Sequence, residues 1–424
     1  MRDSDNGSGT SPTSSAFSVG KRVQSLVLTS LIAMMSFACS SPAPAQAYRQ
    51  CRAPTMDCPF VASLMNQREG YGGKAKGGLN GVFVVVTSSA DSGPGTLSAA
   101  IDEGGGRPVW IVFDKDMTIQ QSSQYRIPSN VTIDGRGHQV TLLDYGLGIY
   151  KVHDVIVTHL TIDGESKTFS QAFNIANFTS NIWADHLDLS RFNDRLIDVK
   201  DGATDTTLSW IKFHDDNKVM LLNNLTQTNM FANYDRDSNN RVTMHHCYFL
   251  NTVQRNPRAQ VGIFHIYNNL LENWDFYGMS FSMEARATVE GNMFLNTSNR
   301  PCNEPAAFAT IEGKDANYCR GIAVAPTRAI LENGSSDKKK YDATNAQFHY
   351  TRDWRAFLKV RDNYFGGEAT AGSFADYQPE KVPTPPYCYS YDHPDQTLIA
   401  RIRREAGNTP YDPAPPHLTC ANGR

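Results

Sequence analysis

The sequence predicts an all-β solenoid, namely a parallel β-helix in which short strands stack coil upon coil. Two observations support this fold class. Short runs of β-type residues recur between about residues 80 and 365, and the same stretch has no long helical periodicity. We therefore expect the coils over about residues 80–365 and a loop-rich C-terminal tail over residues 366–424.

A nearly constant spacing relates seven of these runs. The sixth positions of successive runs lie 22–27 residues apart, except at two longer steps, and a period of 20–50 residues is typical of solenoids. Asn at three of these positions indicates side chains stacked at a bend of the coil, where Cys247 is expected as an inert buried residue. The seven positions are Leu160, Leu187, Ile211, Cys247, Asn269, Asn292 and Asn363.

The segments outside the repeat are expected to form loops, a short helix and a tail. Insertions at residues 221–240 and 298–350 interrupt the spacing, and loops of a solenoid tend to protrude on its binding side. Residues 56–66 predict a short helix that closes the N-terminal end of the solenoid. The proline-rich residues 379–386 and 410–416 predict an extended tail along the coils.

Residues 1–47 have the pattern of a cleaved export signal. Lys21 and Arg22 precede an apolar run, and the small residues Ala45 and Ala47 follow it. A single membrane anchor is the alternative, but the run is shorter than the roughly 20 residues that span a bilayer. We expect a secreted protein with one domain over residues 48–424, monomeric and free of the membrane after processing.

The cysteines agree with an oxidising compartment. The chain has eight, and cleavage of the predicted signal would remove Cys39. Proximity suggests three disulfides, although six cysteines allow 15 pairings. The suggested pairs are Cys51 with Cys58, Cys302 with Cys319, and Cys388 with Cys420.

The net charge of −3 argues against a nucleic-acid partner, which usually requires a basic domain. An acidic substrate remains possible, because a local basic groove binds anions whatever the overall charge.

The residues that could carry chemistry cluster between Asp194 and Arg258. Asp194 and Asp198 are four apart on a predicted strand and therefore face the same way. Two neighbouring carboxylates suit an oxygen-ligated cation such as calcium, although a solvated acidic face is the plainer explanation. Lys218, Arg255 and Arg258 follow on later coils, and such side chains bind substrate carboxylates.

Taken together, these runs resemble the pectate lyase family that includes plant pollen and bacterial soft-rot proteins. The resemblance covers about residues 72–294, with the order of the motifs preserved. Early coils at residues 95–97, 111–113 and 130–137 are similar to that family as well. The main runs are residues 182–186 (IWADH), 196–200 (LIDVK), 218–222 (KVMLL), 241–246 (RVTMHH), 254–258 (QRNPR) and 265–269 (HIYNN).

The resemblance implies a right-handed single-stranded parallel β-helix, bound calcium, and β-elimination of polygalacturonate. Asp194 and Asp198 match positions of calcium ligands. Lys218 and Lys200 match substrate-binding lysines, and Arg258 is a further substrate-binding candidate. Arg255 matches the arginine that removes the proton from C5 of the sugar.

The chain departs from the family pattern at three positions. A further calcium-binding aspartate is missing from residues 170–174, where Gln171 is the candidate that remains. Gln260 stands where the family has a second arginine, and Arg195 lies between the two aspartates. Two alternatives therefore stay open, namely a pectin lyase that acts on methylated substrate without metal, and a non-catalytic polysaccharide-binding β-helix.

Overall fold

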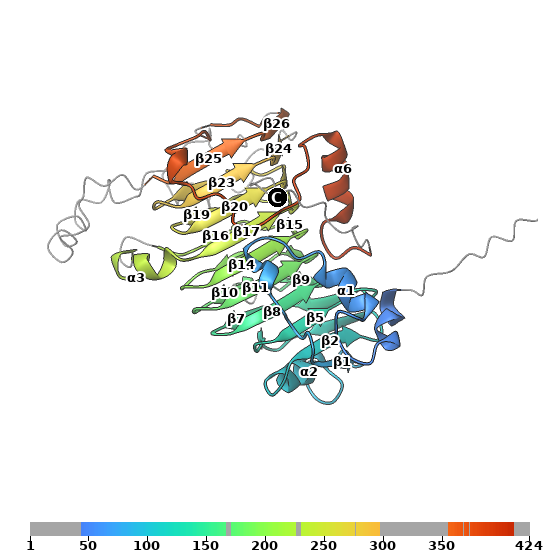
Figure 1. Cartoon of the computed structure of the whole chain (residues 1–424). Helices are drawn as coiled ribbons and strands as arrows, with labels where there is room; N and C mark the ends of the chain where they lie inside the picture. The colour runs from blue at the N-terminus through green and yellow to red at the C-terminus, as the bar shows by residue number, and fades with distance from the viewer. Residues whose placement is uncertain are drawn as a thin grey trace, which may run out of the picture. The chain divides into compact units, whose positions relative to one another are not determined.

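Strands from successive coils pair side by side in three parallel sheets (Figure 1). The computed structural model describes residues 44–166, 171–225, 230–275, 277–296, 355–367, 369–372 and 374–410, all within the unit Pro42–Arg424. The predicted export signal lies almost wholly outside this part of the chain. Every pairing between the named strands is parallel, as predicted for a β-helix.

The ten-stranded sheet runs the full length of the solenoid. Its strands, in spatial order, are β1 (Val82–Val86), β2 (Val109–Phe113), β5 (Val131–Asp134), β8 (His153–Thr158), β11 (Ser180–Asp185), β14 (Thr204–Ser209), β17 (Arg241–His245), β20 (Ile263–Tyr267), β23 (Arg286–Glu290) and β25 (Phe357–Arg361).

The nine-stranded sheet follows the ten-stranded sheet around each coil. Its strands are β3 (Met117–Gln120), β6 (Val140–Leu143), β9 (Thr161–Asp163), β12 (Asp188–Ser190), β15 (Lys212–His214), β18 (Tyr248–Leu250), β21 (Leu270–Glu272), β24 (Met293–Asn296) and β26 (Tyr364–Gly367).

The seven-stranded sheet completes the coil and carries the candidate site. Its strands are β4 (Tyr125–Arg126), β7 (Leu147–Tyr150), β10 (Gln171–Ala176), β13 (Arg195–Val199), β16 (Met220–Leu222), β19 (Arg258–Gln260) and β22 (Ser280–Ser282).

Each predicted run spans a corner between the ten- and nine-stranded sheets. The residue before the marker position turns the chain through a left-handed conformation, as at His186 (φ 46°) and Asn268 (φ 51°). The predicted asparagine ladder is confirmed, because the side-chain oxygen of Asn292 accepts from the backbone and side-chain N–H groups of Asn269. Cys247 is a buried free thiol in the same row, with its backbone N–H bonded to Asn269.

The solenoid interior is apolar because alternate strand residues point inward. In β2, Val109, Ile111 and Phe113 join the interior core, while Trp110 and Val112 face outward into a second buried cluster. Parallel sheets need cover on both faces, and on the outer face of this sheet the N-terminal segment supplies it.

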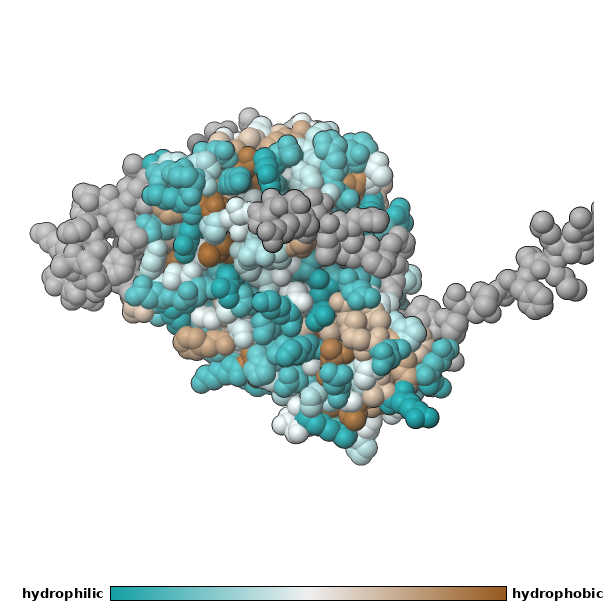
Figure 2. All heavy atoms as spheres, in the orientation of Figure 1, coloured by the Kyte–Doolittle hydropathy of each residue, from teal (hydrophilic) through white to brown (hydrophobic). Residues whose placement is uncertain are grey.

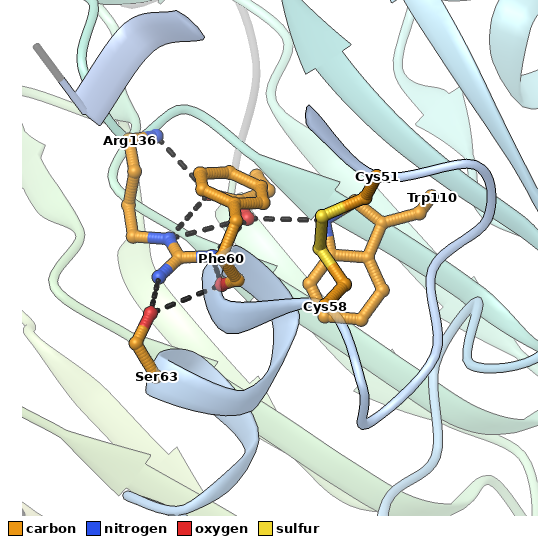
Figure 3. Close-up of a disulfide and its surroundings, with 7 residues drawn as sticks. Cys51, Cys58, Phe60, Ser63, Trp110 and Arg136 are labelled. Atoms are coloured by element: carbon orange, nitrogen blue, oxygen red, sulfur yellow. Dashed lines mark hydrogen bonds and ion pairs between the residues drawn. A yellow bond between two sulfur atoms is a disulfide. The ribbon is translucent and has the colours of Figure 1, made fainter. Parts of the chain in front are cut away.

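The helix predicted over residues 56–66 forms as α1 (Pro59–Met65), but it does not close the end of the solenoid. Its buried face packs on Trp110, Ile156 and Trp183 at the outer face of the ten-stranded sheet. The predicted Cys51–Cys58 disulfide is confirmed beside it. Figure 3 shows Arg136 reaching α1, where it donates to Phe60 O and Ser63 Oγ.

The end of the solenoid is closed instead by α2 (Leu97–Gly104), which lies next to β1 and β2 (Figure 1). Leu97, Ala100 and Ile101 insert into the interior core. Thr96 caps this helix by accepting from Ala99 N. The prediction that residues 56–66 close the solenoid was therefore wrong. The apolar face of α2 packs against the end of the interior core, whereas the apolar face of α1 packs against the outer face of a sheet.

The C-terminal tail is less irregular than predicted. It contains η5 (Pro379–Lys381) and the ten-residue helix α6 (Gln396–Glu405). Leu398, Ile399 and Ile402 of α6 pack on the outer face of the nine-stranded sheet. Asp395 caps α6 by accepting from Thr397 N and Leu398 N.

Between η5 and α6 an extended strap, residues 387–392, lies along the ten-stranded sheet. Tyr387 contacts Thr243 and His265, and Asp392 contacts His246. The N-terminal segment meets the strap at Glu69, which accepts from Ser390. The other short helices among the described residues are η1 (Pro44–Gln50), η2 (Tyr71–Lys74) and α3 (Met230–Asp237).

The insertion at residues 221–240 contains α3, which projects beside the seven-stranded sheet (Figure 1). The insertion at residues 298–350, with Cys302 and Cys319, lies outside the described residues, as does Cys420. Cys388 is disulfide-bonded. Within the described ranges, no helix has the length and apolar character needed to cross a bilayer.

Candidate active site

On the outer face of the seven-stranded sheet, one row of residues, most of them polar, crosses all its strands. The β-helix register aligns one residue per coil, and the row lies between inward-facing neighbours such as Ile175 and Val199. We call this the site row. Its members are Arg126, Gly148, Asn174, Asp198, Leu221, Arg258 and Ser280.

Asp198 is the fully buried acidic centre of the row. Lys200 Nζ lies 2.7 Å from its Oδ2 atom, and Arg195 Nε lies 2.5 Å from its Oδ1 atom. Arg195 also reaches the second aspartate, with 2.7 Å between its Nη1 atom and Asp194 Oδ2. Two carboxylates so close would repel without intervening positive charge, and Arg195 supplies that charge in this structure.

Lys218 approaches the same cluster from the next coil. Its Nζ lies 3.4 Å from Asp194 Oδ1, and its backbone bridges to Gln254. That bridge places Arg255, the next residue, beside the acidic pair. The structure thus brings Asp194, Asp198, Lys200, Lys218 and Arg255 to one face, as the sequence predicted.

Arg255 and Arg258 differ from the other cations of this cluster in having no ion-pair partner in the described part of the chain. The buried Arg255 Nε has no hydrogen-bond partner there either. Burial lowers the pKa of the Arg255 guanidinium, and the positive charges of Arg258 and Arg195 lower it further. A guanidinium in this setting gives up its proton more readily than a solvated one.

Asn174 is an additional candidate residue that the sequence did not predict. It pairs in register with Asp198, whereas Gln171 pairs with Arg195 at the start of the strand. The Asn174 Oδ1 atom is buried and lacks a hydrogen-bond partner in the described part of the chain. Asn174 is therefore better placed than Gln171 to complete an oxygen ligand set with Asp198.

Gln260, at the position of the family's second arginine, has a structural role here. Its side chain is buried, and its Oε1 accepts from Leu225 N at 2.9 Å. Asn223 Nδ2 donates to the Gln260 carbonyl. Gln260 thus anchors the start of the 221–240 insertion beside the site.

A second titratable cluster lies away from this face, where His159, Asp185 and His186 bring potential metal ligands together. The two imidazole rings stack with 4.6 Å between centroids and an interplanar angle of 14°. Stacked rings direct their nitrogen lone pairs in parallel, so these do not converge on one ion. Asp185 already accepts from Ser209 and Thr158, which indicates a structural network.

Comparison with known proteins identifies the class of protein that this fold and site define. A family model described as pectate lyase matches residues 96–393, and the chain belongs to that family. A pectate lyase from Nicotiana tabacum is 32% identical over 252 residues, which cover 53% of this chain and 61% of the relative. Pectate lyase 4 from Ambrosia artemisiifolia is 31% identical over 257 residues, with 55% and 62% covered.

This chain spans less than two thirds of the length of these curated relatives. Solved structures support the fold. The cedar pollen allergen jun a 1 aligns with a TM-score of 0.60 at 23% identity, over 86% of this chain and 99% of the allergen. A pectate lyase from Bacillus sp. N165 in complex with trigalacturonate aligns with a TM-score of 0.54 at 18% identity, over 80% and 98%.

Proposed function

We propose that this protein is a secreted pectate lyase that cleaves polygalacturonate by calcium-assisted β-elimination and releases 4,5-unsaturated oligogalacturonides. The observation that carries the proposal is the charge of the seven-stranded sheet. Arg255 and Arg258 carry no acidic partner among the described residues, and they lie on the face that holds Asp194 and Asp198. Unpaired arginines on an exposed sheet face suit an anionic polymer.

Calcium binding is supported by the oxygen donors on this face. Asp194, Asp198 and Asn174 would hold the ion, and the unpartnered Oδ1 of Asn174 fits an oxygen ligand. Calcium takes six to eight oxygen ligands, so substrate carboxylates and water would supply the rest. When bound, calcium would stabilise the negative charge that develops beside the sugar carboxylate as the C5 proton leaves.

The chain's own residues account for the proton transfer. Lys218 and Lys200 would bind the uronate carboxylate, and their positive charge acidifies the C5–H bond. Arg255, with its lowered pKa, would accept the C5 proton in its deprotonated form. The electron pair of that C–H bond then forms the C4–C5 double bond, and the oxygen at C4 leaves with its electrons.

Arg195 favours a second candidate, a lyase that acts on methylated pectin without metal. Its guanidinium already bridges both aspartates, which lowers the affinity of the pair for a cation. The aspartates themselves oppose this alternative, because a neutral methyl ester gains nothing from buried carboxylates.

One assay separates these functions from a purely binding protein. Polygalacturonate or methylated pectin is mixed with the protein, with calcium or a chelator, and the near-ultraviolet absorbance of the unsaturated product is followed. A signal with polygalacturonate and calcium supports the proposal. A signal with methylated pectin in chelator supports the alternative, and no signal in any mixture contradicts both.

A further inference from the structure

A positively charged feature lies on the site row three strands before Asp198, outside the cluster just described. Arg126 on β4 is exposed and aligns with Gly148, Asn174 and then Asp198 across successive strands. With neighbouring strands about 4.8 Å apart, Arg126 lies about 14 Å along the sheet from Asp198. It forms no ion pair with any described residue.

Exposed arginines elsewhere in the molecule differ in their partners, and Arg49 and Arg52 of the N-terminal segment form no ion pair with a described residue either. Arg403 pairs with Glu272 on the nine-stranded sheet, and Arg241 pairs with Asp205 at 2.7 Å. Arg126 lacks an acidic partner, as do Arg258 on β19 of the same sheet and Arg255 just before that strand, and its register with the site row is what sets it apart from Arg49 and Arg52. Unpaired arginines thus occur on the site row and beside it over five strand spacings.

Tyr150 holds the Arg126 side chain in place. The Arg126 guanidinium lies 4.7 Å from the centroid of the Tyr150 ring, and the Tyr150 hydroxyl donates to Gln124 Oε1 at 2.9 Å. A cation held over the ring in this way keeps its N–H donors available for a ligand, because a ring face takes up no conventional hydrogen bond.

Gly148 makes this arrangement possible. A Cβ atom at Gly148 would lie 2.4 Å from the Tyr150 ring and 2.5 Å from Gln124 Oε1. The ring therefore lies directly over a backbone position without a side chain. The Tyr150 ring thus positions the guanidinium of Arg126, which has no acidic partner among the described residues. The residues that form this arrangement are Gln124, Arg126, Gly148 and Tyr150.

We propose that Arg126 forms a distal subsite for the polymer, where it binds the carboxylate of a uronate sugar several units from the bond that is cleaved, and that Tyr150 is its positioning residue. The inference rests on the proposed function in that it takes the ligand to be a polyuronate. A chain bound along the site row passes Arg258 and Asp198 before it reaches Arg126. Bidentate donation to a carboxylate is the interaction that the planar guanidinium fork favours.

The test compares Arg126→Gln with the wild-type protein on substrates of increasing length. KM for polygalacturonate should rise about three- to tenfold with kcat unchanged, the size expected for one partly exposed charge-assisted contact. Trigalacturonate bound at the cleavage site should show a much smaller change. Arg126→Lys should lie between the two proteins, because it keeps the charge without the planar fork.

Arg403→Gln is the matched control, since it removes the same charge from an exposed arginine on another face. Tyr150→Leu should reproduce the KM effect of Arg126→Gln, and Tyr150→Phe, which keeps the ring, should stay closer to the wild type. An Arg126→Gln protein with unchanged KM on the polymer, or with equal losses on short and long substrates, would overturn the subsite.

Calorimetry of polygalacturonate binding distinguishes a failure of the Arg126 subsite from a failure of the proposed lyase function. If the wild-type protein cleaves the polymer and Arg126→Gln binds it as tightly, only the subsite fails. If the wild-type protein cleaves nothing but binds the polymer through Arg126, the subsite stands and the lyase proposal fails.

Discussion

Arg255 combines a lowered pKa with a position beside the acidic pair, and these two properties predict how activity depends on pH. Activity should rise with pH into the alkaline range, because only the deprotonated guanidinium accepts a proton. Arg255→Lys should move the rising limb of the kcat profile to lower pH, since an amine has a lower ordinary pKa than a guanidinium. A profile that is flat or acidic in the wild type would exclude Arg255 as the base.

Arg195 predicts how tightly calcium binds. Its guanidinium competes with a cation for Asp194 and Asp198, so calcium should bind weakly until the substrate adds its own carboxylates. Arg195→Ala should tighten calcium binding to the free protein by about tenfold or more, as expected when a close charge is removed. Calorimetry measures this directly, and tight binding to the wild-type protein without substrate would contradict the account.

At the scale of residues, the sequence predicts the charged members of the candidate site but not a neutral one. Asp194, Asp198, Lys218 and Arg255 were found because charged residues in ordered motifs are visible in one chain. Asn174 is not evident from the sequence, because a neutral amide is a weaker sign of a cation site than a carboxylate and because its neighbour on the next coil depends on register. A fixed spacing cannot determine register when coils differ in length, and the structure alone aligns Asn174 with Asp198.

At the scale of elements, the asparagine ladder stabilises the corner between two sheets. Asn292 bonds to Asn269 and Asn363, and it also donates to the carbonyls of Ile266 and Glu290. Asn292→Ala should lower the free energy of unfolding by about 2–4 kcal/mol, because buried backbone groups lose their partners. Urea unfolding measures the change.

Asn363→Ala provides the comparison within the same ladder. Asn363 ends the row of described asparagines and is only half-buried, so its loss should cost clearly less. Equal costs at the two positions would mean that burial does not set the energy of the ladder.

Two elements show what the pattern of repeats leaves undetermined. The period predicted the coils because each coil repeats one strand–corner–strand unit. It did not predict α2 or α6, which occur once each. Their caps, Thr96 and Asp395, are the available sequence features, although short caps of this kind are common outside helices as well.

At the scale of the whole molecule, the N-terminal segment and the strap lie over the ten-stranded sheet and bury histidines on its outer face. Burial holds the pKa of His245 well below its usual value, and the neighbouring His246 and His265 lower it further. The folded state therefore keeps His245 neutral while the unfolded state takes up a proton. Stability should be full above about pH 6.5 and should fall as the pH drops below that value, by about 1.4 kcal/mol for each unit by which the pKa is lowered.

Thermal unfolding between neutral and mildly acidic pH tests this sign. His245→Gln should lose less stability on acidification than the wild type, although it is expected to be less stable at neutral pH. Glu69, His246, His265 and Tyr267 surround the ring, so the remaining histidines keep part of the slope. A wild-type protein that gains stability on acidification would contradict the neutral assignment.

The side of the molecule shown in Figure 2 is largely polar. Hydrophilic residues cover much of the side shown in Figure 2, and the hydrophobic spots there are small and separate. Met56, Phe178 and Tyr364 are the exposed large hydrophobic residues within the described ranges. The described residues on this side thus offer no broad hydrophobic patch.

The central claim is that the protein cleaves polygalacturonate by β-elimination, with Arg255 as the base. Mass spectrometry of the products from polygalacturonate tests it most directly, since elimination leaves an unsaturated non-reducing end and hydrolysis adds a water molecule instead. The account predicts unsaturated ends from the wild-type protein and none from Arg255→Ala. Saturated ends, or unsaturated products from Arg255→Ala at the wild-type rate, would contradict it.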